Sequence, residues 1–93
     1  MNLKQLAEKL AEMYQNANDD KVAMIHLFGI RYADEIRLSG YNANDIIKTA
    51  RLRNGKLMPD SYKTEINKGM NLSKYVIDKQ TLKDLIKKSG LRL

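Results

Sequence analysis

Apolar side chains return every three or four positions at the start of the chain, with charged and amide side chains between them. These apolar positions are Leu3, Leu6, Ala7, Leu10, Ala11, Tyr14 and Ala17. This spacing follows the 3.6-residue turn of an α-helix that buries one side. The stripe is interrupted around Asp19-Asp20, where an aspartate can cap a following helix. The pattern therefore predicts an amphipathic helix, a short break and a second helix.

The stretch from Lys21 to Leu38 is the most hydrophobic part of the chain and has little polar surface in its first half. A helix that is apolar nearly all round lies at the centre of a bundle or contacts a partner protein. His26 lies one turn away from two apolar positions, Val22 and Ile30, which favours a structural role for this histidine. Ser39-Gly40 then ends the helix, since glycine accepts the left-handed cap.

Two shorter helices are predicted in the middle of the chain. Asn42 is a good N-cap for a helix that runs through Leu52. A turn at Asn54-Gly55 separates it from the next segment, because this pair tolerates positive φ. With Asp60 as its cap, the following helix is expected from Ser61 to Lys68.

The C-terminal part is expected to contain one more helix. Gly69 is predicted to end the preceding helix, and Met70 to Ile77 to be irregular or extended, with Val76-Ile77 anchored to the core. Asp78 can cap the last helix. Its expected inner stripe is Leu82, Leu85 and Ile86, and its expected exposed lysines are Lys79, Lys83, Lys87 and Lys88.

Five predicted helices and few helix breakers indicate an all-α fold, a compact bundle of about five helices. The 93 residues suffice for one domain, with residues 1–39 as an N-terminal helical pair, residues 40–69 as a central two-helix unit and residues 70–93 as a C-terminal segment and helix. The absence of cysteine, together with a single histidine, predicts no metal site and no small-molecule cofactor. No apolar run reaches the roughly 20 residues of a membrane span, and the N-terminus lacks an apolar signal segment. We therefore expect a bacterial or phage protein of the cytoplasm that does not contact a membrane.

The net charge of +6 is concentrated in the second half of the chain. Residues 1–40 have five Lys/Arg and six Asp/Glu, a balance of −1, whereas residues 41–93 have twelve and five, a balance of +7. A basic half joined to a nearly neutral half is typical of a protein that faces a polyanion. The alternative is ordinary solubility, because lysine-rich helices are common. The cluster of Lys83, Lys87, Lys88 and Arg92 is interpreted as a solvated helix face.

From residue 40 onward, capping, apolar and small residues follow one another in a recognisable order. They are Gly40-Tyr41-Asn42, Ile46, Ala50 and Leu52, followed by the run Ser61-Tyr62-Lys63-Thr64-Glu65-Ile66-Asn67-Lys68-Gly69. This order resembles the phage-repressor (Xre/Cro-like) helix-turn-helix domain over residues 40–89. The sequence is divergent, because Arg51 replaces the glycine usual in the turn and the residues from Arg53 to Pro59 enlarge that turn.

The resemblance implies that residues 61–68 form a recognition helix in the major groove of double-stranded DNA. Tyr62 and Ile66 are expected to pack the inner side of this helix against the core. Either Tyr62 or Lys63 must share the face of Ile66, and Tyr62 is favoured. The candidates for contacts with base edges are Ser61, Lys63, Thr64, Asn67 and Lys68. The candidates for contacts with the DNA backbone are Lys48, Arg51, Arg53 and Lys56. A homodimer is also expected, since such domains bind two-fold operators.

Catalysis is not expected from this sequence. It would need a nucleophile with a base, a metal cluster or carboxylates in opposed environments. The acidic pairs Asp19-Asp20 and Asp34-Glu35 are neighbours in sequence and point in different directions. We therefore expect a small DNA-binding protein, either a transcriptional regulator or an accessory DNA-recognition module. The alternative is a helical protein-interaction module, of antitoxin, anti-restriction or adaptor type, that does not bind nucleic acid directly.

Overall fold

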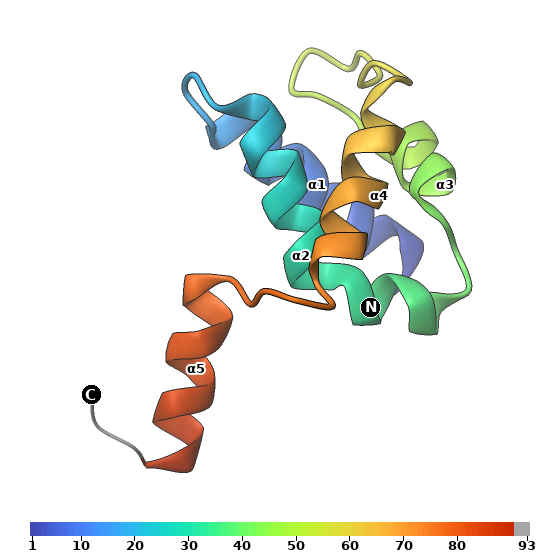
Figure 1. The fold of residues 1–93 in the computed structure, drawn as a ribbon. Helices are drawn as coiled ribbons and strands as arrows, with labels where there is room; N and C mark the ends of the chain where they lie inside the picture. Colours follow the sequence, from blue (N-terminus) through green and yellow to red (C-terminus); the bar gives the residue numbers. More distant parts are fainter. Residues whose placement is uncertain (91–93) are drawn as a thin grey trace.

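The structure is a computed structural model that describes residues 1–90 and contains five α-helices (Figure 1). They are α1 (Leu3–Asn16), α2 (Lys21–Ser39), α3 (Ala43–Thr49), α4 (Tyr62–Leu72) and α5 (Lys79–Ser89). Within these residues, extended pairing is limited to one isolated bridge between Arg51 and Leu57. The expected all-α class with about five helices is confirmed. Arg92, expected in the basic cluster, lies outside the described residues.

Helix α2 lies at the centre of the fold, as its hydrophobic sequence predicts. Helices α1 and α4 pack against it, and α3 contacts both α1 and α4. The largest fully buried side chains come from all four of these helices: Leu6, Leu10, Ile25, Phe28, Ile36, Ile46, Ile47 and Ile66. Burial of each such side chain contributes roughly 1.5–3 kcal/mol. Helices α1 to α4 therefore share one apolar interior.

Helices α1 and α3 both begin with reciprocal hydrogen bonds. The Asn2 side chain accepts from the Gln5 backbone N–H at 2.8 Å, and the Gln5 side chain accepts from the Asn2 backbone N–H at 3.0 Å. Asn42 and Asp45 repeat this capping box at 2.9 and 3.0 Å. The predicted cap at Asn42 is confirmed.

Helices α2 and α4 cross in direct backbone contact at Gly29 and Gly69. A Cβ atom added to Gly69 would lie 2.2 Å from the carbonyl oxygen of His26, and one added to Gly29 would lie 2.5 Å from that of Ile66. Only glycine fits two positions where backbones approach so closely. The expectation that Gly69 ends the fourth helix is therefore wrong. Helix α4 continues to Leu72, and Gly69 serves the packing of α4 on α2.

The connection between α3 and α4 is a folded turn. Helix α3 ends at Thr49, before the expected end at Leu52, because the backbone becomes extended at Ala50. The Leu52 N–H donates to the Lys56 carbonyl at 2.9 Å, and the Gly55 N–H donates to the Leu52 carbonyl at 2.8 Å. Gly55 has a φ of 80°, so the turn predicted at Asn-Gly is confirmed.

Helix α4 begins after a tight turn, and the predicted capping role of Asp60 is wrong. The Tyr62 N–H donates to the Pro59 carbonyl at 3.1 Å, and the Lys63 N–H donates to the Asp60 carbonyl at 3.2 Å. The N-cap position is occupied by Ser61, without a side-chain hydrogen bond. Backbone carbonyls thus accept the first N–H groups of the helix. The Asp60 carboxylate pairs with Lys63 instead, with Oδ2 3.2 Å from Nζ.

Helix α5 projects from the body formed by the other four helices, at the lower left of Figure 1. Its predicted cap is confirmed, because the Asp78 carboxylate accepts from the N–H groups of Gln80 and Thr81 at 3.0 and 3.1 Å. No residue of α5 is buried. The expected inner position of Leu82 and Leu85 is wrong, since both are exposed. The segment before α5 leads the helix away from the core.

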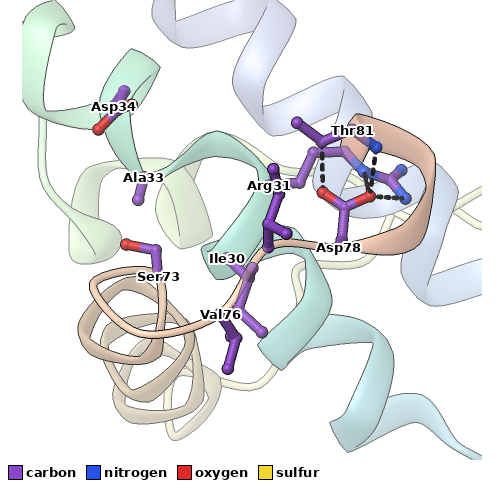
Figure 2. Close-up of a pocket in the computed structure, with 9 residues that line it drawn as sticks. Ile30, Arg31, Ala33, Asp34, Ser73, Val76, Asp78 and Thr81 are labelled. Carbon is purple, nitrogen blue, oxygen red and sulfur yellow. Dashed lines mark hydrogen bonds and ion pairs between the residues drawn. The ribbon is translucent and has the colours of Figure 1, made fainter. Parts of the chain in front are cut away.

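An ion pair, and not an apolar contact, anchors the segment between α4 and α5. Val76 and Ile77, expected to reach the core, are each 48% exposed. Arg31 of α2 instead donates from Nε and Nη2 to Asp78 Oδ1, both at 3.3 Å (Figure 2). The Thr81 hydroxyl also donates to this carboxylate. The start of α5 is therefore fixed to α2 by charge.

Candidate nucleic-acid interface

Helix α4 is held to the body along one side, which sets the direction of its other side. Ile66 is fully buried in the core. Tyr62 meets Tyr14 of α1 edge to face, with ring centroids 5.4 Å apart, so its predicted inner position is confirmed. Near the other end of α4, Arg37 Nη2 donates to the Met70 carbonyl at 3.1 Å. Contacts at both ends and in the middle therefore limit rotation of the helix.

The opposite side of α4 carries four exposed polar side chains: Thr64, Asn67, Lys68 and Asn71. Steps of three and four residues place them on one face. Among these four, the hydrogen bonds found within residues 1–90 engage only the side chain of Lys68, which donates to Glu65. One hydroxyl and two amides are thus available to an external partner.

The acidic residue of α4, Glu65, lies beside this face and is paired with cations. Its Oε2 contacts Nε2 of His26 on α2, and its Oε1 lies 3.2 Å from Lys68 Nζ. Hydrogen bonds from His26 and Lys68 hold the pKa of the Glu65 carboxyl below its usual range. The stabilisation from this charged carboxylate is present above the unfolded pKa and is lost as pH falls through the lowered value. At neutral pH the negative charge is therefore countered locally.

Two expected base-edge residues lie off the exposed face. Ser61 precedes α4 at the N-cap position and is exposed. Lys63 is half-buried on the flank, with Nζ 3.2 Å from Asp60 Oδ2. The structure thus brings three of the five predicted residues onto one face of α4 and leaves Ser61 and Lys63 near its N-terminal end.

The four cations expected to contact the DNA backbone divide into two pairs. Arg51 Nη1 donates to the Lys48 carbonyl at 2.6 Å, and Arg53 Nη2 donates to Asn16 Oδ1 at 3.0 Å. These arginines close the end of α3 and tie the turn to α1. Lys48 and Lys56 are exposed, and neither ammonium takes part in an ion pair within residues 1–90.

Asn71 is the residue of this face that sequence reasoning missed. It follows Asn67 by one helical turn and continues the spacing that starts at Thr64. A helix that ended at Gly69, as the sequence predicted, would not contain Asn71. The continued spacing was a signal for Asn71, but the role of Gly69 depends on Gly29, which is distant in sequence.

A separate hollow of about 200 Å³ lies between α2 and the segment after α4 (Figure 2). Burial raises the pKa of Asp78 in its wall, but hydrogen bonds from Thr81 and Arg31 outweigh this effect and hold the pKa below its usual range. Two charged side chains of this hollow, Arg31 and Asp78, thus fix the start of α5, whereas Asp34 pairs with Arg37 of the same helix. Across residues 1–90, no group of three or more histidine, aspartate or glutamate side chains is placed to hold a metal ion. No helix in the same part of the chain has the length and apolar content needed to cross a bilayer.

Comparison with known proteins identifies the domain type. A family described as "HTH-like domain" matches residues 2–79, which hold α1 to α4 and end at the first residue of α5. No curated protein and no solved structure matches the chain. The match supports a helix-turn-helix family without singling out the phage-repressor type. The chain belongs to the HTH-like domain family.

Proposed function

We propose that this protein binds double-stranded DNA with α4 as its recognition helix. The observation that carries this proposal is the exposed face of α4, where Thr64, Asn67, Lys68 and Asn71 offer hydroxyl, amide and ammonium groups. Such groups form hydrogen bonds with base edges and phosphates. A recognition helix also needs a rigid inner side, which Ile66 and the contact between Gly29 and Gly69 supply here.

The electrostatics of α4 support the same proposal. A carboxylate on a DNA-facing helix is repelled by phosphates unless a cation accompanies it. Glu65 has two such partners, His26 and Lys68. The balance of +7 over residues 41–93 adds a general attraction to a polyanion.

We assign the phosphate contacts first to Lys48, Lys56 and Lys63. The ion pair of Lys63 with Asp60 is largely exposed and therefore weak, so a phosphate can replace it. Arg51 and Arg53 come second, because a phosphate must displace their hydrogen bonds to the protein.

The biological role proposed is that of a transcriptional regulator or an accessory DNA-recognition module. The finer proposal is a divergent phage-repressor (Xre/Cro-like) type with an enlarged turn, acting in the cytoplasm of a bacterium or on phage DNA. At the N-terminal end of α4, Ser61 would then add a contact to a base edge and Lys63 a contact to a phosphate.

Fluorescence anisotropy with an arbitrary DNA duplex tests the proposed function. We expect the logarithm of the affinity to fall linearly with the logarithm of salt between about 50 and 200 mM. Lys48→Ala and Lys56→Ala should each reduce the slope by about one and weaken binding to all sequences alike. Lys9→Ala, on the exposed side of α1 where its ammonium pairs with Glu12, is the matched control and should leave the slope unchanged. Absence of binding at about 50 mM salt would refute the proposal.

A helical protein-interaction module without nucleic-acid binding is the second candidate function. It is favoured by one observation, a series of exposed apolar side chains from the end of α4 into α5. This C-terminal strip consists of Leu72, Tyr75, Val76, Ile77, Leu82 and Leu85. Exposed apolar patches commonly mark protein interaction sites. A protein that stays folded and binds no duplex at any salt concentration would favour this candidate.

A further inference from the structure

We propose that α4 reads two adenines in the major groove, one with Asn67 and the other with Asn71, an inference that rests on the proposed DNA-binding function. The amide of asparagine matches adenine at two atoms. Its carbonyl oxygen accepts from the N6 amino group while its NH₂ group donates to N7. Both asparagines are exposed on the same face of α4.

The spacing of the two amides sets the spacing of the two bases. Four residues of α-helix rise about 6 Å along the axis. Successive base pairs of DNA rise about 3.4 Å. Asn67 and Asn71 therefore reach adenines that are adjacent or separated by one base pair.

The neighbours of these amides favour A·T pairs over G·C pairs. Arginine or lysine reads guanine, and a free carboxylate reads cytosine. The lysine of this face, Lys68, is paired with the Glu65 carboxylate, and that carboxylate also contacts His26, so both groups are engaged within the protein. Thr64, on the same face, offers a methyl group that can contact the thymine methyl. The side chains of this face that have no hydrogen-bond partner within residues 1–90 thus match adenine and thymine.

Selection of duplexes from a random library by the full chain tests this inference. We expect the enriched motif to contain two adenines, adjacent or one base pair apart. The Asn67→Ala variant should lose the preference for one adenine, and Asn71→Ala should lose the preference for the other. Alanine retains the helix, since it is the strongest helix former. Circular dichroism checks that both variants remain folded.

A modified base distinguishes recognition of base edges in the major groove from recognition of DNA shape. Replacing either adenine with 7-deazaadenine removes the N7 acceptor and keeps Watson–Crick pairing. Each replacement should weaken binding between about fivefold and a hundredfold for the wild-type protein. The matching asparagine variant should be insensitive to it. Asn18→Ala, exposed between α1 and α2, is the matched control and should leave the motif unchanged.

The possible results distinguish adenine recognition from DNA binding itself. Duplex binding without an adenine preference, or with a preference that both asparagine variants keep, would overturn adenine reading and leave DNA binding in place. Failure to retain any duplex at low salt would overturn both.

Discussion

Glycine at positions 29 and 69 determines how closely α2 and α4 approach each other. In an exposed helix, replacing glycine with alanine stabilises the fold by about 1 kcal/mol, because glycine is the more flexible residue. At the crossing of α2 and α4 the same substitution destabilises the fold, because a methyl group on Gly69 would collide with the backbone oxygen of His26. The close approach also brings the His26 ring to the Glu65 carboxylate. Two residues without side chains thus position the flank of the candidate DNA-binding face.

We expect Gly69→Ala to destabilise the protein by at least about 3 kcal/mol, as measured by urea unfolding. The cause is a contact of 2.2 Å with backbone atoms, which cannot rotate away as a flexible side chain can. Gly55→Ala is the control, because Gly55 has a φ of 80° and open space around it. The Gly55→Ala substitution should lower the free energy of unfolding by only about 1–2 kcal/mol, because alanine disfavours the left-handed backbone conformation. A Gly69→Ala variant more stable than the wild type would show that the two helices do not touch here.

At the scale of elements, α5 differs from the other four helices. Helices α1 to α4 bury apolar side chains in a common core, whereas α5 has no buried residue. Its position depends on the Asp78 carboxylate, which caps the helix and pairs with Arg31. A helix of 11 residues is marginal without tertiary contacts. Helix α5 therefore forms a unit of lower local stability than the body.

Asp78→Ala should release α5 while leaving the body folded. Loss of the cap removes about 1 kcal/mol from α5, and loss of the ion pair frees its start from α2. We expect amide hydrogen exchange in α5 to become roughly fivefold faster or more, with exchange in α2 and α4 unchanged. The control is Asp84→Ala, an exposed carboxylate of the same helix. Equal acceleration in α4 would show that α5 and the body unfold together.

At the scale of the whole molecule, the chain combines α4, whose exposed face is polar, with the C-terminal strip that begins at the last residue of this helix, Leu72. Helix-turn-helix proteins commonly bind as dimers to half-sites one DNA turn apart. A second copy that covered the strip would remove this apolar surface from water. Under the proposed function, the homodimer expected from the sequence is the form that would bind DNA.

Sedimentation equilibrium should therefore show self-association of the wild-type protein at high concentration. The double substitution Leu82→Ser and Leu85→Ser should yield a monomer, because both leucines are exposed and lie within the strip. Since neither side chain belongs to the core, circular dichroism of the body should be unchanged. The matched control is Leu38→Ser, at a leucine that is 87% exposed and outside the strip. A wild-type protein that remains monomeric at high concentration would contradict the dimer.

Features that depend on residues a few positions apart could be predicted from the sequence. The all-α class, the central place of the Lys21–Leu38 stretch, the caps at Asn42 and Asp78 and the Asn-Gly turn are confirmed. Hydrophobic periodicity and capping hydrogen bonds act within one or two helical turns. The same local reasoning proposed five residues for the exposed side of this helix. Thr64, Asn67 and Lys68 share one face of α4, whereas Ser61 and Lys63 lie off it.

Features that depend on contacts between distant segments required the tertiary structure. Gly69 looks like a helix terminator until Gly29 is seen against it, and Asn71 enters the candidate site only because α4 continues past that contact. The leucines of α5 have the spacing of a buried stripe, yet burial needs a facing surface, and the Asp78 anchor leads the helix away from one. A sequence specifies which side of a helix can be buried. Whether a partner surface reaches that side is decided by the packing of the whole chain.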